Sequence, residues 1–343
     1  MKKPRFSVII PLYNKAPYIR KALTSIMSQT FNDWELIIVD DGSTDNSAAL
    51  CEEFFQTFNR SLAHSINDNR SFVHSFIRQT NSGVAAARNN GVAASHGEFV
   101  CFLDADDWWG PTFLEEMNRL ITEYPEAGLY ATNFVYYKPG KTHVEHTNLK
   151  TGYINYPEVY ASTGSMPVWT GAACMPRKVF DEVGGFPVGV KLGEDFLLWA
   201  KTALYYPVAF SEKPLAYYNN DVPASLRATR NLHAPEHHML FNLGALDEEI
   251  ENLSLVHSLT PSIVTFWKHL FDKLRISGLL DYWMDERYHA DAAAELAKVD
   301  WSQQPHSAKT PYDQPIWLLR TKRYLMQIGS YCKQKLIHIT HHT

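Results

Sequence analysis

The sequence has few cysteines and no pattern that would join them. The four are scattered and include no Cys-x-x-Cys pair; they are Cys51, Cys101, Cys174 and Cys332. Neither a disulfide framework nor a zinc site is therefore indicated. Because disulfides are rare in the cytoplasm, reduced thiols in a cytoplasmic protein are the expected state.

Long hydrophobic runs and an excess of basic residues are also missing. No apolar stretch approaches the roughly 20 residues that a membrane span needs. The apolar segment 6–10 is too short for the apolar region of a signal peptide, and the residues that follow it do not fit one either. The formal net charge of −5 provides no basic field for nucleic acid. We expect a cytoplasmic protein that does not bind nucleic acid and that could meet a membrane only from its surface.

A glycine-rich phosphate loop is absent after the first expected strand. Residues 11–14 read Pro-Leu-Tyr-Asn, without the Gly-x-Gly-x-x-Gly of a dinucleotide-dependent dehydrogenase. A nucleotidyltransferase that makes sugar nucleotides would also carry a glycine-rich, basic loop there. A haloacid-dehalogenase-type phosphatase begins with Asp-x-Asp after a strand, but Trp108 stands where its Thr or Val normally follows. These three enzyme classes are disfavoured.

The most informative stretch that is present is residues 98–109, Glu-Phe-Val-Cys-Phe-Leu-Asp-Ala-Asp-Asp-Trp-Trp. Its short apolar run predicts a buried strand that ends at Asp104, Asp106 and Asp107. In an open α/β sheet, ligands bind outside the carboxyl ends of the strands. Carboxylates this close repel unless a cation, a shared proton or water offsets them. Mg²⁺ or Mn²⁺, bound together with substrate phosphates, would offset this repulsion, and a solvated turn at the end of the strand is the simpler alternative.

Strand and helix patterns alternate along most of the chain. Segments of both kinds are bounded by turn residues, with strands expected at 6–10, 35–39, 71–77, 99–103, 127–137 and 167–175, and helices at 17–27, around 50–54, 84–91, 111–124, 177–183 and from 193. Segments 58–71 and 138–160 show no clear pattern and are expected to be irregular. This alternation predicts an α/β fold with a mostly parallel central sheet.

The C-terminal part has a different character. After about residue 226 the sequence reads as scattered helical segments, and after Asp313 no acidic residue follows. Basic and apolar residues alternate along 315–338 in the manner of a basic amphipathic helix, which can lie on an anionic membrane surface. Packing of its apolar stripe on the main domain is the alternative.

Five motifs together resemble the family 2 glycosyltransferases. They occur in the family's order, as Val-Ile-Ile-Pro-Leu-Tyr-Asn at 8–14, Val-Asp-Asp-Gly-Ser-Thr-Asp at 39–45, Asn-x-Gly at 81–83 with Ala-Arg-Asn at 87–89, Asp-Ala-Asp-Asp at 104–107 and Gly-Glu-Asp at 193–195. The resemblance covers roughly residues 6–230. It implies the GT-A fold, a Rossmann-like αβα sandwich, and inverting transfer from a nucleotide-diphosphate sugar, with a UDP-sugar favoured. The acceptor would be a hydroxyl of a glycan or lipid-linked glycan.

The same resemblance implies a division of the chain. A GT-A domain would span 1–230, with a nucleotide-binding half at 1–107 and an acceptor half at 108–230. A helical extension with the basic tail would occupy 231–343.

The resemblance also assigns the donor site. The nucleotide-binding candidates share positions at strand ends or on the Ala-rich helix, and they are Pro11, Tyr13, Asn14, Asp41, Arg88 and Asp104. Asp41 could accept the imide N–H of uracil, or it could stabilise its own turn. Arg88 would lie near the base or phosphates, or be an ordinary residue of the helix surface. Asp106 would ligate Mn²⁺ or Mg²⁺, whereas Asp107 would be a second ligand or, as we favour, a helix cap.

The base that inversion requires is assigned to Asp195. It would take the proton of the acceptor hydroxyl on the face opposite the leaving phosphate. Glu194 would orient it or contact a substrate, although first-turn acids can also simply complement the positive end of a helix. Trp199, one turn further on, could stack on an acceptor sugar, and core packing is the favoured alternative.

Two further features lie near or beyond the motifs. Arg227 and Arg230 occupy the place where related enzymes carry a mobile loop that closes over the diphosphate. Specificity for the sugar is expected in irregular segments such as 138–171. The implied setting is bacterial surface polysaccharide or lipopolysaccharide assembly, with possible attachment to the inner face of the cytoplasmic membrane. A catalytically silent nucleotide- or carbohydrate-binding scaffold is the non-enzymatic alternative.

Overall fold

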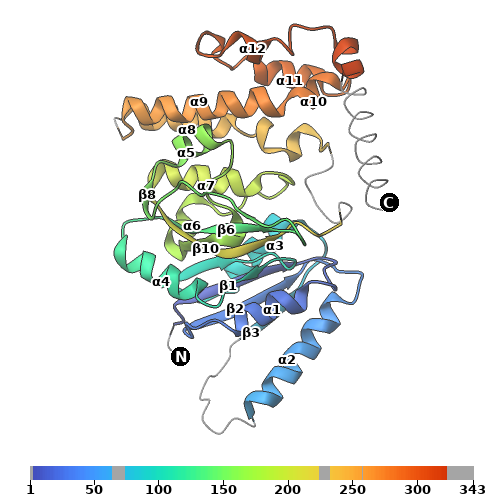
Figure 1. The fold of residues 1–343 in the computed structure, drawn as a ribbon, viewed down its shortest axis with the longest axis vertical. Coiled ribbons are helices and arrows are strands. Elements are labelled where there is room, and N and C mark those ends of the chain that lie inside the picture. Colours follow the sequence, from blue (N-terminus) through green and yellow to red (C-terminus); the bar gives the residue numbers. More distant parts are fainter. Residues whose placement is uncertain (1–2, 64–73, 224–231, 257, 323–343) are drawn as a thin grey trace.

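A computed structural model of the chain describes residues 3–63, 74–223, 232–256 and 258–322 (Figure 1). Its centre is one sheet with the strand order β3-β2-β1-β4-β9-β6-β10-β5, in which β7 also pairs with β6 and β8 with β10. The strands are β1 (Phe6–Leu12), β2 (Trp34–Asp40), β3 (His74–Arg78), β4 (Phe99–Phe102), β5 (Trp108–Trp109), β6 (Leu129–Tyr137), β7 (His143–Val144), β8 (Gly152–Ile154), β9 (Ala173–Pro176) and β10 (Val208–Asn219).

The long strands pair in parallel and bring their carboxyl ends to one edge. β1 lies between β2 and β4 and is parallel to both, and β2 is parallel to β3. β6 and β10 form a second parallel pair, and the short antiparallel β9 joins it to β4. The expected α/β fold with a mostly parallel sheet is therefore confirmed. Because β1, β2 and β4 end side by side, the loops that follow them meet.

Helices cover both faces of the sheet. The period-two alternation of β1 sends Val8 and Ile10 into one hydrophobic cluster and Ile9 into another. The first cluster lies under α1 (Ile19–Met27), α2 (Ser47–Ala63) and α4 (Phe113–Glu123). The second lies under α3 (Val84–Ala93), α6 (Arg177–Val183) and α7 (Glu194–Tyr205). On α3, a Cβ at Gly91 would lie 2.4 Å from Ile9 Cγ2, so the helix approaches the sheet closely at this glycine.

The C-terminal helices continue the second cluster. They are α8 (Gly244–Leu255), α9 (Pro261–Gly278), α10 (Leu280–Met284), α11 (His289–Leu296) and α12 (His306–Lys309). In Figure 1 they form a layer beyond α7. The buried Trp267 of α9 stacks on Tyr156 of α5 (Tyr156–Thr163), with ring centroids 5.9 Å apart. The expected helical extension is confirmed, and the boundary at residue 230 stays a prediction. In the described part of the chain, no helix combines the length and apolar character needed to cross a membrane.

Four segments differ from the expectation. The strand expected at 167–175 begins only at Ala173, because the short helix η1 (Thr170–Ala172) precedes it. α2 continues to Ala63, although residues 58–71 were expected to form a loop. Segment 138–160 contains β7, β8 and α5, all too short to leave a periodic signal. The long strand β10 was not expected, because Pro214 and two register shifts interrupt its alternation.

Candidate active site

The loops after β1 and β2 are tied together by one asparagine. Asn14 has a φ of 50°, a left-handed conformation that Asn tolerates better than most residues. Its Oδ1 accepts hydrogen bonds from the backbone N–H groups of Thr44 at 2.8 Å and Asp45 at 3.2 Å. Pro11 lies within β1, and the neighbouring Tyr13 is 46% exposed. The expected nucleoside residues therefore stand at one edge of the sheet, and their contact with a base stays a prediction.

Asp41 is buried and holds the loop that precedes α3. Its Oδ1 accepts hydrogen bonds from Ser82 N and Gln79 Nε2, both at 2.7 Å, and its Oδ2 accepts one from Gly83 N at 2.9 Å. These bonds are of the turn-stabilising kind. A carboxylate offers about four acceptor positions, so room for one uracil N–H remains. The uracil contact is untested.

Asp106 is paired with a lysine. Lys15 Nζ lies 2.6 Å from Asp106 Oδ2, and each of the two side chains is only 17% exposed. Burial raises the pKa of Asp106, and the ammonium of Lys15 opposes that rise. An ammonium thus offsets one of the clustered carboxylates.

Asp107 is neither exposed nor a helix cap. Its Oδ1 accepts a hydrogen bond from Asn219 N at 2.6 Å, at the end of β10. The helix cap favoured from the sequence is wrong, because α4 begins only at Phe113. Burial, together with the charges of Asp106 and Asp104, raises the pKa of Asp107 well above its ordinary value.

Arg88 joins the strand-end acids to the start of α7. Its Nη2 lies 2.8 Å from Asp104 Oδ1, and its Nη1 lies 2.8 Å from Glu194 Oε1. Only 4% of the arginine side chain is exposed, so the helix-surface alternative is wrong. Burial works against the charged form, but Asp104 and Glu194 outweigh it and raise the pKa of Arg88. The two acids, from distant motifs, therefore belong to one site.

Glu194 and Asp195 open helix α7 in different environments. Glu194 is buried, and burial together with the charge of Asp195 raises its pKa to about 7, although Arg88 opposes this. Asp195 is only partly buried. Its Oδ2 accepts a hydrogen bond from Thr170 Oγ1 at 2.9 Å, and its Oδ1 accepts one from Phe196 N at 2.8 Å. Both oxygens are thus oriented while the carboxylate stays reachable.

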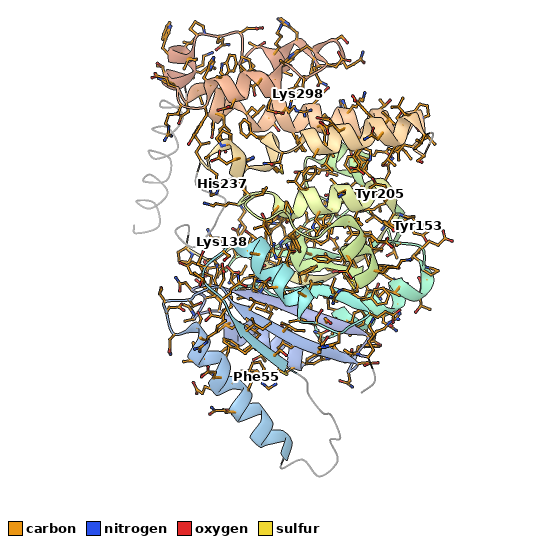
Figure 2. The ribbon with its side chains drawn as sticks, turned by 180° about the vertical axis from the view of Figure 1, so that it is seen from behind. Phe55, Lys138, Tyr153, Tyr205, His237 and Lys298 are labelled. Carbon is orange, nitrogen blue, oxygen red and sulfur yellow. The ribbon has the colours of Figure 1, made fainter. Side chains whose placement is uncertain are left out.

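The C-terminal extension holds the loop that leads into α7. Lys191 N donates to His237 O at 2.8 Å, and Met239 N donates to Leu192 O at 3.0 Å. Gly193 has a φ of 81°, and a Cβ there would lie 2.4 Å from Met239 Sδ. Figure 2 shows His237 where the extension meets the rest of the molecule. Sequence reasoning missed this contact, because backbone hydrogen bonds leave no residue-type signal.

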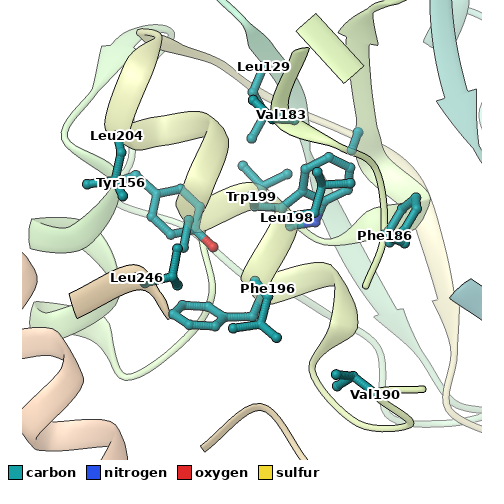
Figure 3. Packing of buried hydrophobic residues seen from close by; sticks show 14 of the residues in the cluster. Leu129, Tyr156, Val183, Phe186, Val190, Phe196, Leu198, Trp199, Leu204 and Leu246 are labelled. Carbon is teal, nitrogen blue, oxygen red and sulfur yellow. The ribbon is translucent and has the colours of Figure 1, made fainter. Parts of the chain in front are cut away.

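The remaining residues singled out in the sequence lie in the core or outside the described residues. Trp199 is fully buried, with its ring centroid 5.7 Å from that of Phe186, so the favoured core alternative is confirmed (Figure 3). Arg227, Arg230 and the tail from residue 323 lie outside the described residues. The described start of the tail contains the exposed Trp317.

The described side chains could hold a divalent cation only if a bound substrate supplied further oxygen ligands. Among the described residues, no group of three or more His, Cys, Asp or Glu side chains could hold a metal ion. Mg²⁺ is often held by one or two carboxylates plus substrate phosphates. Asp106, with Asp104 beside it, is a donor set of this incomplete kind.

Comparison with known proteins places these motifs in a family. The model for glycosyl transferase family 2 matches residues 7–184, just over half of the 343 residues. EpsH of Bacillus subtilis is 39% identical over 134 residues, which cover 39% of this chain and 35% of EpsH. A glycosyltransferase of Nostoc sp. is 32% identical over 230 residues, covering 62% of this chain and 64% of the relative. TuaG of Bacillus subtilis, named for teichuronic acid biosynthesis, is 35% identical over 121 residues, covering 35% of this chain and 43% of TuaG. The chain thus spans from about a third to just under two thirds of the length of these relatives.

Solved structures share the fold. Staphylococcus aureus TarS 1–349 in complex with UDP-GlcNAc superposes with a TM-score of 0.69 at 19% identity, covering 90% of this chain and 83% of that one. The mannosyltransferase PcManGT of Pyrobaculum calidifontis, in complex with GDP-Man and Mn²⁺, gives a TM-score of 0.54 at 21% identity, covering 97% and 84%. The expected GT-A fold is confirmed. Together with the family match over residues 7–184, this shows that the chain belongs to glycosyl transferase family 2.

Proposed function

We propose that this chain is an inverting glycosyltransferase that moves a sugar from a UDP-sugar to a hydroxyl of a glycan or lipid-linked glycan. One observation carries the proposal: Arg88 joins Asp104, at the end of a strand, to Glu194, beside the candidate base. The candidate donor acid and the candidate base would therefore share one site. The UDP-GlcNAc complex of TarS supports a UDP-sugar, and the GDP-Man complex of PcManGT supports testing other nucleotides.

The donor side would bind the nucleotide diphosphate. Asp106, with help from Asp104, would hold Mn²⁺ or Mg²⁺ once the diphosphate supplies further oxygen ligands. The bound metal would supply Lewis-acid neutralisation of the leaving diphosphate. The nucleoside would lie against Pro11, Tyr13, Asn14 and Asp41. Arg88 would act on the donor through Asp104, since both of its paired nitrogens already contact carboxylates.

The base side would accept one proton. Inversion in a single displacement requires a base on the face of the sugar opposite the diphosphate, and a carboxylate can serve as that base. Asp195 is suited to this, because Thr170 and its own helix fix its two oxygens without enclosing it. Glu194 would shape the charge around Asp195. Arg227 and Arg230 would close over the diphosphate.

The cellular setting is inferred from relatives. TuaG suggests assembly of a bacterial surface polysaccharide, and lipopolysaccharide is the related option. The protein would act in the cytoplasm, and residues 315–338 would attach it to the inner face of the membrane. A silent nucleotide- or carbohydrate-binding scaffold is the alternative.

Calorimetry with four nucleotides tests the donor site. UDP, GDP, dTDP and CDP are titrated with Mn²⁺ and with EDTA, using the wild type, Asp106→Ala, and Asp291→Ala, which removes an exposed acid of α11. We expect UDP binding that requires Mn²⁺ and that only Asp106→Ala weakens, by at least about tenfold, roughly 1.4 kcal/mol.

Other results would redirect the proposal. Preference for another nucleotide would change the donor but keep the site. Equal binding by Asp106→Ala and wild type would remove Asp106 from the metal site. Tight UDP binding with no turnover of any UDP-sugar, alone or with an acceptor, would favour the scaffold.

A further inference from the structure

Four aromatic side chains stand on the Asp195 side of the site. We call Tyr136, Tyr160, Trp169 and Tyr218 the aromatic wall. They come from β6, α5, the segment before the short helix η1 (Thr170–Ala172), and β10, and all four are partly buried. The ring centroid of Tyr218 lies 5.3 Å from that of Tyr136 and 5.3 Å from that of Trp169. Tyr136, Trp169 and Tyr218, from elements distant in sequence, thus form one aromatic contact group, and Tyr160 is close enough to Tyr136 for the two to interact electrostatically.

The aromatic wall adjoins the candidate base at two points. Thr170, which follows Trp169, donates the hydrogen bond to Asp195 Oδ2. Tyr160 packs edge-on against Phe196, with ring centroids 5.7 Å apart, and Phe196 follows Asp195. Burial, then the charge of Asp195, then Tyr136 raise the pKa of Tyr160 to about 12. Its hydroxyl therefore stays protonated and can donate a hydrogen bond at any physiological pH.

The aromatic wall also carries polar groups that the protein does not use. Within the described ranges, the hydroxyls of Tyr136 and Tyr160 and the indole N–H of Trp169 have no hydrogen-bond partner, and none of the three is fully enclosed. Buried polar groups are normally paired, so reachable unpaired donors beside flat rings suit a ligand that has hydroxyls.

The backbone at Gly171 determines where the Trp169 ring can lie. Its ring lies directly over Gly171, where a Cβ would come within 2.3 Å of the ring atom Cη2. The carbonyl of Gly171 is itself fixed, because Trp109 Nε1 donates to it at 2.6 Å. A larger residue at 171 would displace the indole.

Three rings of the aromatic wall carry no cation from the described residues. In the part of the chain that the structure describes, no Lys or Arg lies over the rings of Tyr136, Tyr160 or Trp169. By contrast, Lys21 Nζ lies 2.9 Å from the ring centroid of Trp108 and 4.9 Å from that of Tyr137. Binding of an anionic polyol phosphate would need a cation, whereas binding of a neutral sugar needs a flat face for stacking and hydrogen-bond donors.

We propose that the aromatic wall is the acceptor subsite and that it binds the ring of a neutral pyranose. This inference rests on the proposed function and names its acceptor class. The sugar would stack on Trp169, while Tyr136 and Tyr160 donate to its hydroxyls and a further hydroxyl faces Asp195. That hydroxyl oxygen forms the new bond to the anomeric carbon of the donor sugar as the carbon–oxygen bond to the diphosphate breaks. The bond electrons leave with the diphosphate, and the hydroxyl proton passes to Asp195.

The test measures acceptor binding directly. Saturation-transfer NMR with UDP and Mg²⁺ present compares the methyl pyranosides of glucose, galactose, mannose and N-acetylglucosamine with glycerol phosphate. Kinetics then follow UDP release with the glycoside that binds. We expect Trp169→Leu to raise the glycoside KM at least tenfold, with a much smaller change in the UDP-sugar KM. Trp169→Phe, which keeps a stacking face, should recover most of the loss.

Matched controls separate binding from folding. Trp317→Leu removes an exposed tryptophan, and Tyr153→Phe removes the hydroxyl of an exposed tyrosine of β8 (Figure 2). We expect Tyr160→Phe, but neither control, to weaken glycoside binding. The thermal midpoint of each variant reports whether it is folded.

Several results would overturn the assignment. Glycoside binding that Trp169→Leu leaves intact, or binding of glycerol phosphate and of no glycoside, would each do so. Normal UDP binding with no glycoside bound would overturn the acceptor subsite alone. Absence of binding of all four nucleotides, UDP, GDP, dTDP and CDP, would instead reject the proposed function, and the acceptor subsite with it.

Discussion

Asp106 on the proposed donor side stands just beyond the end of a strand, whereas Asp195 on the proposed base side stands at the start of a helix. The donor side is assembled from β1, β2 and β4, whose parallel pairing brings their ends together. The base side depends on contacts with two other segments, which contain Thr170 and Met239. The strand of its own motif thus places each candidate donor acid, while the segment of the candidate base is also held by contacts with Thr170 and the extension.

The largest effect is expected when the base itself is changed. Asp195→Asn keeps the shape of the side chain and its contact with Thr170 but cannot take a proton. Because a positioned general base contributes about 10²–10⁴-fold, kcat should fall by that factor. UDP affinity should change little, since the donor side is held separately. Steady-state kinetics and calorimetry measure the two quantities.

Equal loss of kcat and UDP affinity in Asp195→Asn would contradict the separation of the donor side from the base side, because it would place Asp195 on the donor side. Asp291→Asn, on α11, is the matched control.

A smaller effect is expected when the support of the base is disturbed. Gly193→Ala places a Cβ 2.4 Å from Met239 Sδ at a φ of 81°. The left-handed backbone alone costs an alanine about 1–2 kcal/mol. We expect the free energy of unfolding to fall by that amount and further by the cost of the clash with Met239. We also expect kcat to be roughly tenfold lower, because α7 is displaced. Adding Met239→Ala should restore the part due to the clash.

Gly184→Ala is the control for this cycle, because Gly184 has a φ of 95° and no neighbour within 4 Å of an added Cβ. Urea unfolding and kinetics give the coupling energy between positions 193 and 239. A coupling near zero would show that the extension does not position the base.

The smallest effect concerns pH. Burial and the charge of Asp195 raise the pKa of Glu194 to about 7 from an ordinary value of 4.5. Between these pH values the folded protein holds a proton that the unfolded chain releases, so this residue makes the free energy of unfolding fall as pH rises. Glu194→Gln cannot titrate and should flatten this fall between pH 5 and pH 8. Urea unfolding at both pH values, with the exposed Glu248→Gln as control, measures the change. Identical pH slopes in Glu194→Gln and wild type would contradict the environment described for Glu194.

The sequence predicted the donor side better than the base side for a physical reason. Asp104 and Asp106 follow an apolar run, so periodicity alone places them at a strand end. The partner of Arg88 was not predictable, because Glu194 lies 106 positions away and only the fold brings them together. The role of Met239 left no trace either, since its contact with Leu192 is made by backbone atoms. The aromatic wall was missed because its residues come from four separate segments that only the fold brings together.

The pairing of Lys15 with Asp106 has a consequence for the order in which ligands arrive. One oxygen of Asp106 is already held by an ammonium group at 2.6 Å. A free divalent cation would have to displace that lysine while gaining few protein ligands in return. A metal that arrives already bound to the nucleotide diphosphate brings its own oxygens and gives the displaced lysine a phosphate to contact. We therefore expect metal and donor to enter as one complex, so that the kinetics depend on the concentration of that complex rather than on free metal.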